Sequence, residues 1–193
     1  MPNDRLVFVI PSLGGGGAER VAILLAPRLA TTFAVHLVLL ENRIVFPSPT
    51  DLQTEVLLPR LPGPIAHLLA LPFLAIRLRR LLRRVRPQAV LASMEEANLL
   101  AILATAGLPI RLVIVQHVEP RRHHPAQGWI GRMLLRGMRS LYPRANLVVA
   151  VSRKVAEDES AACGLPARSV IVIPNPIDLR HIAEAARRPP ATD

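Results

Sequence analysis

The 193 residues of the chain show two patterns of apolar positions, short continuous runs and helical spacing. Short apolar runs rich in β-branched residues predict buried strands, and these runs lie at 6–10, 35–40, 55–58, 88–92, 112–115, 147–151 and 170–173. Most segments between them carry apolar residues at helical spacing. This alternation predicts an α/β fold, in which helices cover both faces of a Rossmann-like parallel sheet.

The first predicted strand is followed by four glycines, Gly14 to Gly17, and then by a helical pattern. Glycine has no Cβ, so a ligand can approach the backbone closely. The N–H groups of a first helical turn have no partner inside the helix, and the macrodipole makes that end positive. The turn therefore predicts either a phosphate or diphosphate site at the carboxyl end of a strand, or a tight connection without a ligand.

The segment 65–85 predicts an amphipathic helix with a strongly basic polar face. Its second half has leucines on one face, and the remaining positions carry Arg77, Arg79, Arg80, Arg83, Arg84 and Arg86. We expect the helix to begin at Pro72, because proline is tolerated in a first turn but breaks a helix interior. The basic face is typical either of a solvated packing helix or of a surface that contacts anionic lipid headgroups.

A capping-box pattern follows the strand at 88–92, with Ser93 three residues before Glu96. We expect Ser93 to be the N-cap of a helix that runs to Ala106. Glu95 and Glu96 then serve capping and the helix dipole, with a catalytic carboxylate as the alternative.

His117 comes directly after the strand at 112–115 and so lies on the same rim of the predicted sheet as the glycines. An imidazole there can hydrogen-bond a hydroxyl or a phosphate, or it can be an ordinary satisfied loop histidine. His123 and His124 follow in a predicted loop over 120–128, but no carboxylate or cysteine pattern accompanies them. We therefore expect no metal site.

The composition narrows the class of partner. The chain has 24 Lys and Arg against 14 Asp and Glu, a net charge of +10, which favours anionic membranes or nucleic acid. Aromatic residues are too scarce for base stacking, so we expect no nucleic acid. The run 6–10 is too short for a secretory signal, and no apolar run has the length of a membrane span. We expect a cytoplasmic protein, peripheral on the inner face of a membrane.

Six segments resemble family 4 (group 1) glycosyltransferases, in the order that this family uses. The first, PSLGGGGAERVAILLA at 11–26, resembles the first loop and helix of the family. The others are LLRRVRPQAVLAS (81–93), EEANLLAILA (95–104), IVQH (114–117), VAVSRKVAE (149–157) and VIVIPNPID (170–178). Together they span nearly the whole chain.

The resemblance implies one half of a GT-B fold, in which two Rossmann-like domains face each other across a cleft. Residues 1–178 would be the N-terminal, acceptor-side domain, and 179–193 would begin the linker to a second domain. The implied activity is transfer of a sugar from a nucleotide-sugar donor to a glycan or lipid-linked acceptor, with retention, as in polysaccharide biosynthesis. No cofactor or metal is implied.

The resemblance also implies roles for individual residues. The backbone N–H groups around Gly15, Gly16 and Gly17 would meet the donor diphosphate, and His117 would be the catalytic histidine that contacts the transferred sugar. The acceptor or membrane side would carry basic residues, namely Arg77, Arg80, Arg84, Arg121 and Arg122.

The sequence departs from the family in lacking the second domain, with its paired glutamates and the basic residues that neutralise the leaving diphosphate. We therefore expect the isolated chain not to turn over. Two alternatives stay open. The first is a dinucleotide-binding domain: Glu41 ends the second strand, where an acid would meet a ribose, but Glu19 stands where the glycine fingerprint requires a small residue. The second is a basic, non-enzymatic module on membranes or nucleic acid.

Overall fold

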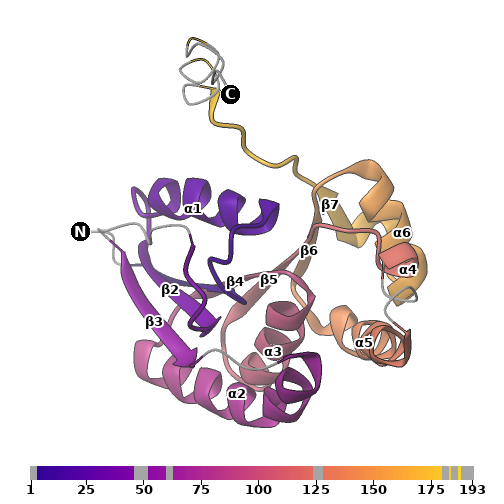
Figure 1. Ribbon diagram of the computed structural model, residues 1–193, viewed down its shortest axis with the longest axis horizontal. Helices are drawn as coiled ribbons and strands as arrows, with labels where there is room; N and C mark the ends of the chain where they lie inside the picture. Colours follow the sequence, from indigo (N-terminus) through magenta and orange to yellow (C-terminus); the bar gives the residue numbers. More distant parts are fainter. Residues whose placement is uncertain are drawn as a thin grey trace, which may run out of the picture.

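The seven predicted strands form one parallel sheet within the part of the chain that the structure describes. The computed structural model describes residues 4–45, 52–59, 63–123 and 128–179, with residues 183 and 187. The strands are β1 (Arg5–Ile10), β2 (Ala34–Glu41), β3 (Gln53–Leu58), β4 (Ala89–Ser93), β5 (Arg111–Gln116), β6 (Leu147–Ala150) and β7 (Val170–Val172). Their order is β3-β2-β1-β4-β5-β6-β7, and all neighbouring pairs are parallel (Figure 1).

Helices connect most of the strands. They are α1 (Gly17–Leu29), α2 (Gly63–Val85), α3 (Glu95–Thr105), α4 (Pro120–His123), α5 (Gly128–Leu141) and α6 (Arg153–Cys163), with short 3₁₀ turns η2 (Tyr142–Arg144) and η3 (Ala167–Ser169). The α/β, Rossmann-like class is confirmed. Because the strands are parallel, the segments after β1, β4 and β5 all leave from one rim of the sheet, which we call the carboxyl rim.

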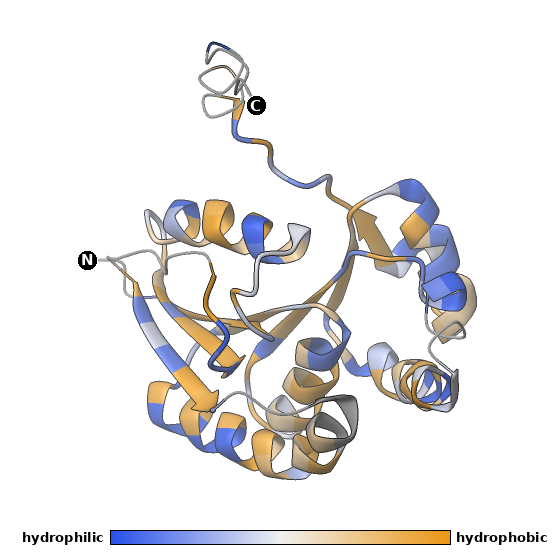
Figure 2. Cartoon of the chain, viewed as in Figure 1, coloured by the Kyte–Doolittle hydropathy of each residue, from blue (hydrophilic) through white to orange (hydrophobic). Residues whose placement is uncertain are grey.

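The two faces of the sheet carry separate cores of different size. On one face α1 packs over β1 and β2, where Ala22 and Ala26 meet Phe8 and Leu37. On the other face α2, α3, α5 and α6 share the larger core (Figure 1). Apolar residues dominate the strands and the sheet-facing sides of these helices (Figure 2). The aliphatic residues of the helices thus cover the largely apolar sheet from both sides.

The expected helix start at Pro72 is wrong, because α2 begins at Gly63 and continues through Pro72. Pro72 lies on the exposed side of the helix, where its ring packs against no core residue, although it removes one hydrogen bond of the helix. On the sheet side, Leu74 and Leu78 are at most 1% exposed. Burial of each such leucine contributes about 1.5–3 kcal/mol, which together offsets a proline penalty of about 3 kcal/mol.

Three other local expectations need correction or lie outside the description. The N-cap of α3 is Met94 rather than Ser93, whose hydroxyl has another partner. The predicted loop at 120–128 contains the short helix α4, and residues 124–127 lie outside the described part of the chain. The linker expected at 179–193 also lies largely outside it.

Both ends of α6 carry residues that are typical helix caps. The Ser152 hydroxyl accepts a hydrogen bond from the Val155 N–H at 3.3 Å, so Ser152 is the N-cap. Gly164 follows the helix with φ 65°, in the left-handed region that ends many helices. These caps fix where the chain leaves β6 and returns to β7.

Candidate functional site

The glycine turn and His117 lie on the same rim of the sheet, as predicted. The turn follows the carboxyl end of β1 and His117 follows that of β5, with β4 between these two strands. The end of β4 provides the connection, because Ser93 Oγ and His117 Nε2 are 2.8 Å apart. The structure thus brings three consecutive strand ends together into a candidate site.

The fold requires a glycine to different degrees at Gly15, Gly16 and Gly17, the three positions around the start of α1. Gly15 has φ 99°, a conformation that side chains with a Cβ rarely adopt. A Cβ on Gly16, the N-cap, would lie 2.5 Å from Oε2 of Glu19. A Cβ on Gly17 would meet no atom within 4 Å. Gly17 is therefore the position at which the fold itself does not require a glycine, and where the open space is available to a ligand.

Two charged side chains, Glu19 and Arg43, flank this turn. Glu19 is 9% exposed, and its carboxylate folds back beside Gly16. Arg43 lies on the other side, with its Nε 3.0 Å from the position of a Cβ on Gly14. The Leu13 N–H donates to the Arg43 carbonyl at 2.9 Å, which holds the segment after β2 against the turn. An anion at the turn would meet backbone N–H groups and a guanidinium, with one carboxylate opposing it.

His117 is partly buried, and its environment affects its charge. Burial lowers the pKa of His117 below its ordinary value, while the carboxylates of Glu95 and Glu19 act in the opposite direction. The imidazole is therefore neutral near pH 7. When Nε2 is unprotonated, the Ser93 hydroxyl donates to it, which leaves the Nδ1–H of that tautomer as a donor for a ligand oxygen.

The turn between β4 and α3 has an unusual backbone. Met94 has φ 78° and ψ 150°, although it carries a side chain. Such a conformation costs on the order of 1–3 kcal/mol and persists only where surrounding contacts impose it. Here the strained residue lies between Ser93, which contacts His117, and Glu95, which accepts a hydrogen bond from Gln116. Strain of this kind is common at binding sites.

The predicted basic residues fall into two groups that the structure does not bring together. On α2, Arg77 lies over the ring of Phe73 at 5.7 Å, and Arg80 is exposed. Arg84 forms an ion pair with Glu55 on β3, so the sheet edge already neutralises part of its charge. The α2 arginines therefore do not all present a free charge to a surface.

The second group lies on α4, which packs against α6 on the opposite flank of the molecule (Figure 1). The Arg121 guanidinium is 3.9 Å from Asp158, whose carboxylate also accepts the Arg121 backbone N–H at 2.8 Å. Arg122 is exposed. The two groups therefore lie on different flanks of the molecule, and their place on an acceptor or membrane side stays a prediction.

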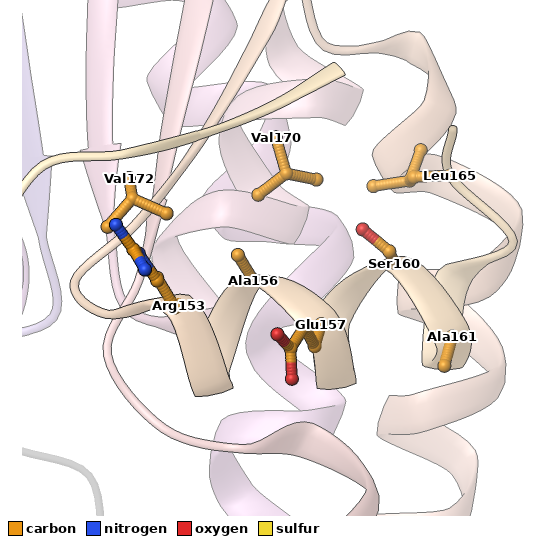
Figure 3. Close-up of a pocket in the computed structure, with 8 residues that line it drawn as sticks. All are labelled: Arg153, Ala156, Glu157, Ser160, Ala161, Leu165, Val170 and Val172. Atoms are coloured by element: carbon orange, nitrogen blue, oxygen red, sulfur yellow. The ribbon is translucent and has the colours of Figure 1, made fainter. Parts of the chain in front are cut away.

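A cavity of about 560 Å³ lies between α6 and β7, away from the candidate site (Figure 3). Ala156, Leu165 and Val170 form its apolar wall, and Arg153 extends beside Val172 at one end. Neither His117 nor the glycine turn lines it. Within the described ranges no cluster of metal-ligating side chains occurs, and the absence of a metal remains a prediction.

The carboxyl-rim site lies where open α/β proteins as a class bind their ligands, at the ends of strands and the starts of helices. The sequence signature of Glycosyltransferase Family 4 matches residues 15–181, and the chain belongs to that family. Its sheet and helices correspond to the N-terminal half of a GT-B fold, as the resemblance implied.

A relative from Campylobacter jejuni is 31% identical over 186 residues, which are 95% of this chain and 51% of the relative. It is named N-acetylgalactosamine-N,N'-diacetylbacillosaminyl-diphospho-undecaprenol 4-alpha-N-acetylgalactosaminyltransferase. The chain therefore spans about half the length of this relative.

Solved structures share the fold at low sequence identity. Anabaena HepE in complex with UDP has a TM-score of 0.70 at 21% identity, over 91% of this chain and 45% of that one. The lipopolysaccharide outer core galactosyltransferase WaaB gives 0.65 at 14%, over 91% and 46%. The UDP-GlcNAc 2-epimerase of Methanocaldococcus jannaschii gives 0.61 at 16%, over 89% and 45%. Because epimerases share this half-fold with transferases, the fold alone does not define a reaction.

Proposed function

We propose that this chain is the acceptor-side half of a retaining glycosyltransferase, which transfers a sugar from a nucleotide-sugar donor to a lipid-linked or other glycan acceptor. The observation that carries the proposal is the meeting of the glycine turn and the Ser93–His117 pair on one rim, in a chain of this family. The name of the Campylobacter relative, which includes a diphospho-undecaprenol substrate, supports a lipid-linked acceptor. The UDP bound by Anabaena HepE supports a nucleotide donor.

The donor diphosphate, in this proposal, lies against the N-terminus of α1. The N–H groups of Gly15, Gly16 and Gly17 are available for charge-assisted hydrogen bonds there, and Arg43 adds a positive charge. Glu19 would orient the approaching anion by repulsion, so that it meets the open side of Gly17 rather than the side of Gly16.

His117 contacts a hydroxyl of the transferred sugar through its neutral imidazole. A neutral donor suits this role, because a hydroxyl needs a hydrogen-bond partner and carries no charge to neutralise. Ser93 holds the ring in place from the side of β4. The acceptor would approach along the same rim.

A second lobe would supply the remaining donor contacts and neutralise the leaving diphosphate. This part of the proposal is supported by the relatives, which are about twice as long as the chain. We therefore expect no sugar transfer from the purified 193-residue chain when a UDP-sugar and a diphospho-undecaprenol-linked glycan are supplied. Measurable turnover by the chain alone would contradict this expectation.

Titration with UDP, followed by amide NMR, tests the donor site. We expect the largest shifts at Gly15–Gly17 and Arg43, and we expect Gly17→Ala to weaken binding about tenfold or more, since displacing a phosphate by one methyl loses about one charge-assisted hydrogen bond. Gly137→Ala on α5 is the matched control, because its Cβ would find only ordinary contacts at 3.8 Å. Equal UDP affinities for wild type and Gly17→Ala would contradict the proposal that the donor diphosphate binds at this turn.

We also propose that the protein works at an anionic, cytoplasmic membrane surface through α2. Exposed apolar residues lie along the N-terminal and central turns of α2, with Leu69 76%, Phe73 51% and Ile76 50% exposed. Exposed Arg77 and Arg80 follow on the same helix, so apolar and basic groups adjoin. No helix in the described ranges has the length and apolarity needed to cross a bilayer.

Co-sedimentation with vesicles of phosphatidylglycerol and phosphatidylcholine tests this surface. We expect binding that falls with salt, and a severalfold loss in Phe73→Ser and Arg80→Glu. Arg28→Glu, an exposed arginine on α1, gives the same charge change on the opposite face and should bind more strongly than Arg80→Glu. Equal losses in the two charge variants would indicate attraction by net charge alone.

A further inference from the structure

Gln116, the last residue of β5, is 0% exposed and directly precedes His117. Its Nε2 donates two hydrogen bonds, one to Glu95 Oε1 at 2.9 Å and one to the Val118 carbonyl at 3.1 Å. Gln116 and Val118 flank His117 in the chain. The second bond therefore closes the backbone around the histidine, and the first ties that loop to the start of α3.

The orientation of the Gln116 amide is fixed by its partners. An ionised carboxylate and a backbone carbonyl can only accept, so both must face the NH₂ group. The amide oxygen then faces Tyr142, whose hydroxyl donates to it at 3.3 Å and itself accepts from Asn98 Nδ2 at 3.1 Å. The hydrogen bonds from Asn98 to Tyr142, from Tyr142 to Gln116 and from Gln116 to Glu95 all run in one direction, toward the Glu95 carboxylate. Each bond in such a series polarises the next.

The chain gives His117 a second attachment to the neighbouring strand end. Ser93 Oγ holds the ring, while Gln116 holds Glu95 two residues further along. Between these two points lies Met94 with its strained backbone. Two attachments on either side of a strained turn fix the position of the imidazole more tightly than one hydrogen bond could.

We infer that Gln116 is a positioning residue for His117: through its bonds to Glu95 and Val118 it holds the imidazole at the carboxyl rim, between β4 and the glycine turn. The inference rests on the proposed function in one respect only, namely that His117 contacts the transferred sugar. Gln116 itself is buried beneath the rim and reaches no ligand.

Replacement of Gln116 by methionine tests the role, because methionine is similar in length and fills the same space without the donors. We expect the loop to open to water and the pKa of His117 to rise toward its ordinary value, since burial is the main cause that lowers it. Glu95 and Glu19, the charged groups that face the ring, both act upward and do not oppose this change. Ring resonances followed by NMR against pH report it, with His117 assigned from His117→Gln.

Two further variants keep the test decisive. Tyr142→Phe keeps Gln116 but removes the hydrogen bond to its amide oxygen, together with the one that Asn98 Nδ2 donates to the Tyr142 hydroxyl. It should shift the His117 titration in the same direction by less, and it is the deciding variant if Gln116→Met does not fold. Gln53→Met makes the same exchange at the exposed start of β3 and should leave the titration unchanged.

An unchanged His117 titration in both Gln116→Met and Tyr142→Phe, with only a lower melting temperature, would reduce Gln116 to a packing residue and overturn the inference. A shifted titration supports it. If His117→Gln then leaves UDP-sugar contacts unaltered, the positioning stands and the proposed role of His117 falls.

Discussion

Glu159 on α6 has no place in the proposed site, yet its ionisation should make the stability of this protein depend on pH. Its side chain is 0% exposed, and only one carboxyl oxygen has a partner among the described residues, the Cys163 thiol, which donates to Oε1 at 3.0 Å. Burial raises the pKa of Glu159 from 4.5 to about 7, an effect that the Cys163 bond only partly offsets. The folded chain therefore keeps a proton on Glu159 that the unfolded chain releases.

The size of the effect follows from these two values. Below pH 4.5 the carboxyl is protonated in both states, so its favourable contribution is fully present. Between pH 4.5 and about 7 this carboxyl ionises only in the unfolded state, and its contribution to the free energy of unfolding falls by about 1.4 kcal/mol per pH unit. The total loss is up to about 3 kcal/mol, complete once the pH exceeds the folded pKa.

Urea unfolding of wild type and Glu159→Gln at several pH values between 5 and 8 measures this loss. The amide cannot ionise, so the stability of the variant relative to wild type should increase with pH by up to about 3 kcal/mol. Glu157→Gln, on the exposed side of the same helix, is the control and should follow wild type. Parallel stability curves for wild type and Glu159→Gln would refute the reasoning.

Three further predictions concern single groups. Gly15→Ala should lower the free energy of unfolding by about 1–3 kcal/mol, because Gly15 has a positive φ. Gly16→Ala should lower it by less than about 1 kcal/mol, because the atom that its Cβ would meet is the movable carboxylate end of Glu19. Thermal melts compare the two variants. Ser152→Ala should lose about 1 kcal/mol with its helix cap, against no loss for Ser140→Ala in the last turn of α5, where Ser140 is not a cap. Cys163 should react with a thiol reagent only at the rate of unfolding, because burial raises the pKa of its thiol; a reaction rate independent of urea would contradict this.

The strands and most helices could be predicted because apolar periodicity is a local property of the sequence. Pro72 shows where local rules fail: burial of the leucines on α2 overrode a proline that should have ended the helix. Likewise Ser93 matched a capping box, but the structure gave its hydroxyl to His117, 24 residues further along the chain.

Within the candidate site, the glycines and His117 were predictable because their types and positions at strand ends carry chemical meaning. Gln116 and Tyr142 were not, because their roles come from long-range contacts that no spacing encodes. One signal was available for Gln116: it is an amide at the end of an apolar strand, and a buried polar group requires partners.

The unequal covering of the sheet has a consequence for how the molecule fluctuates. Among the described helices, α1 alone packs on the smaller core, whereas α2, α3, α5 and α6 share the larger one. Protection against hydrogen–deuterium exchange should therefore be lowest in α1 and its glycine turn, and highest in β4, β5 and α3. The segment that presents amide groups to a phosphate would then detach and redock as a unit while the rest of the protein stays folded, so that a bound anion would show itself first as slowed exchange at that helix.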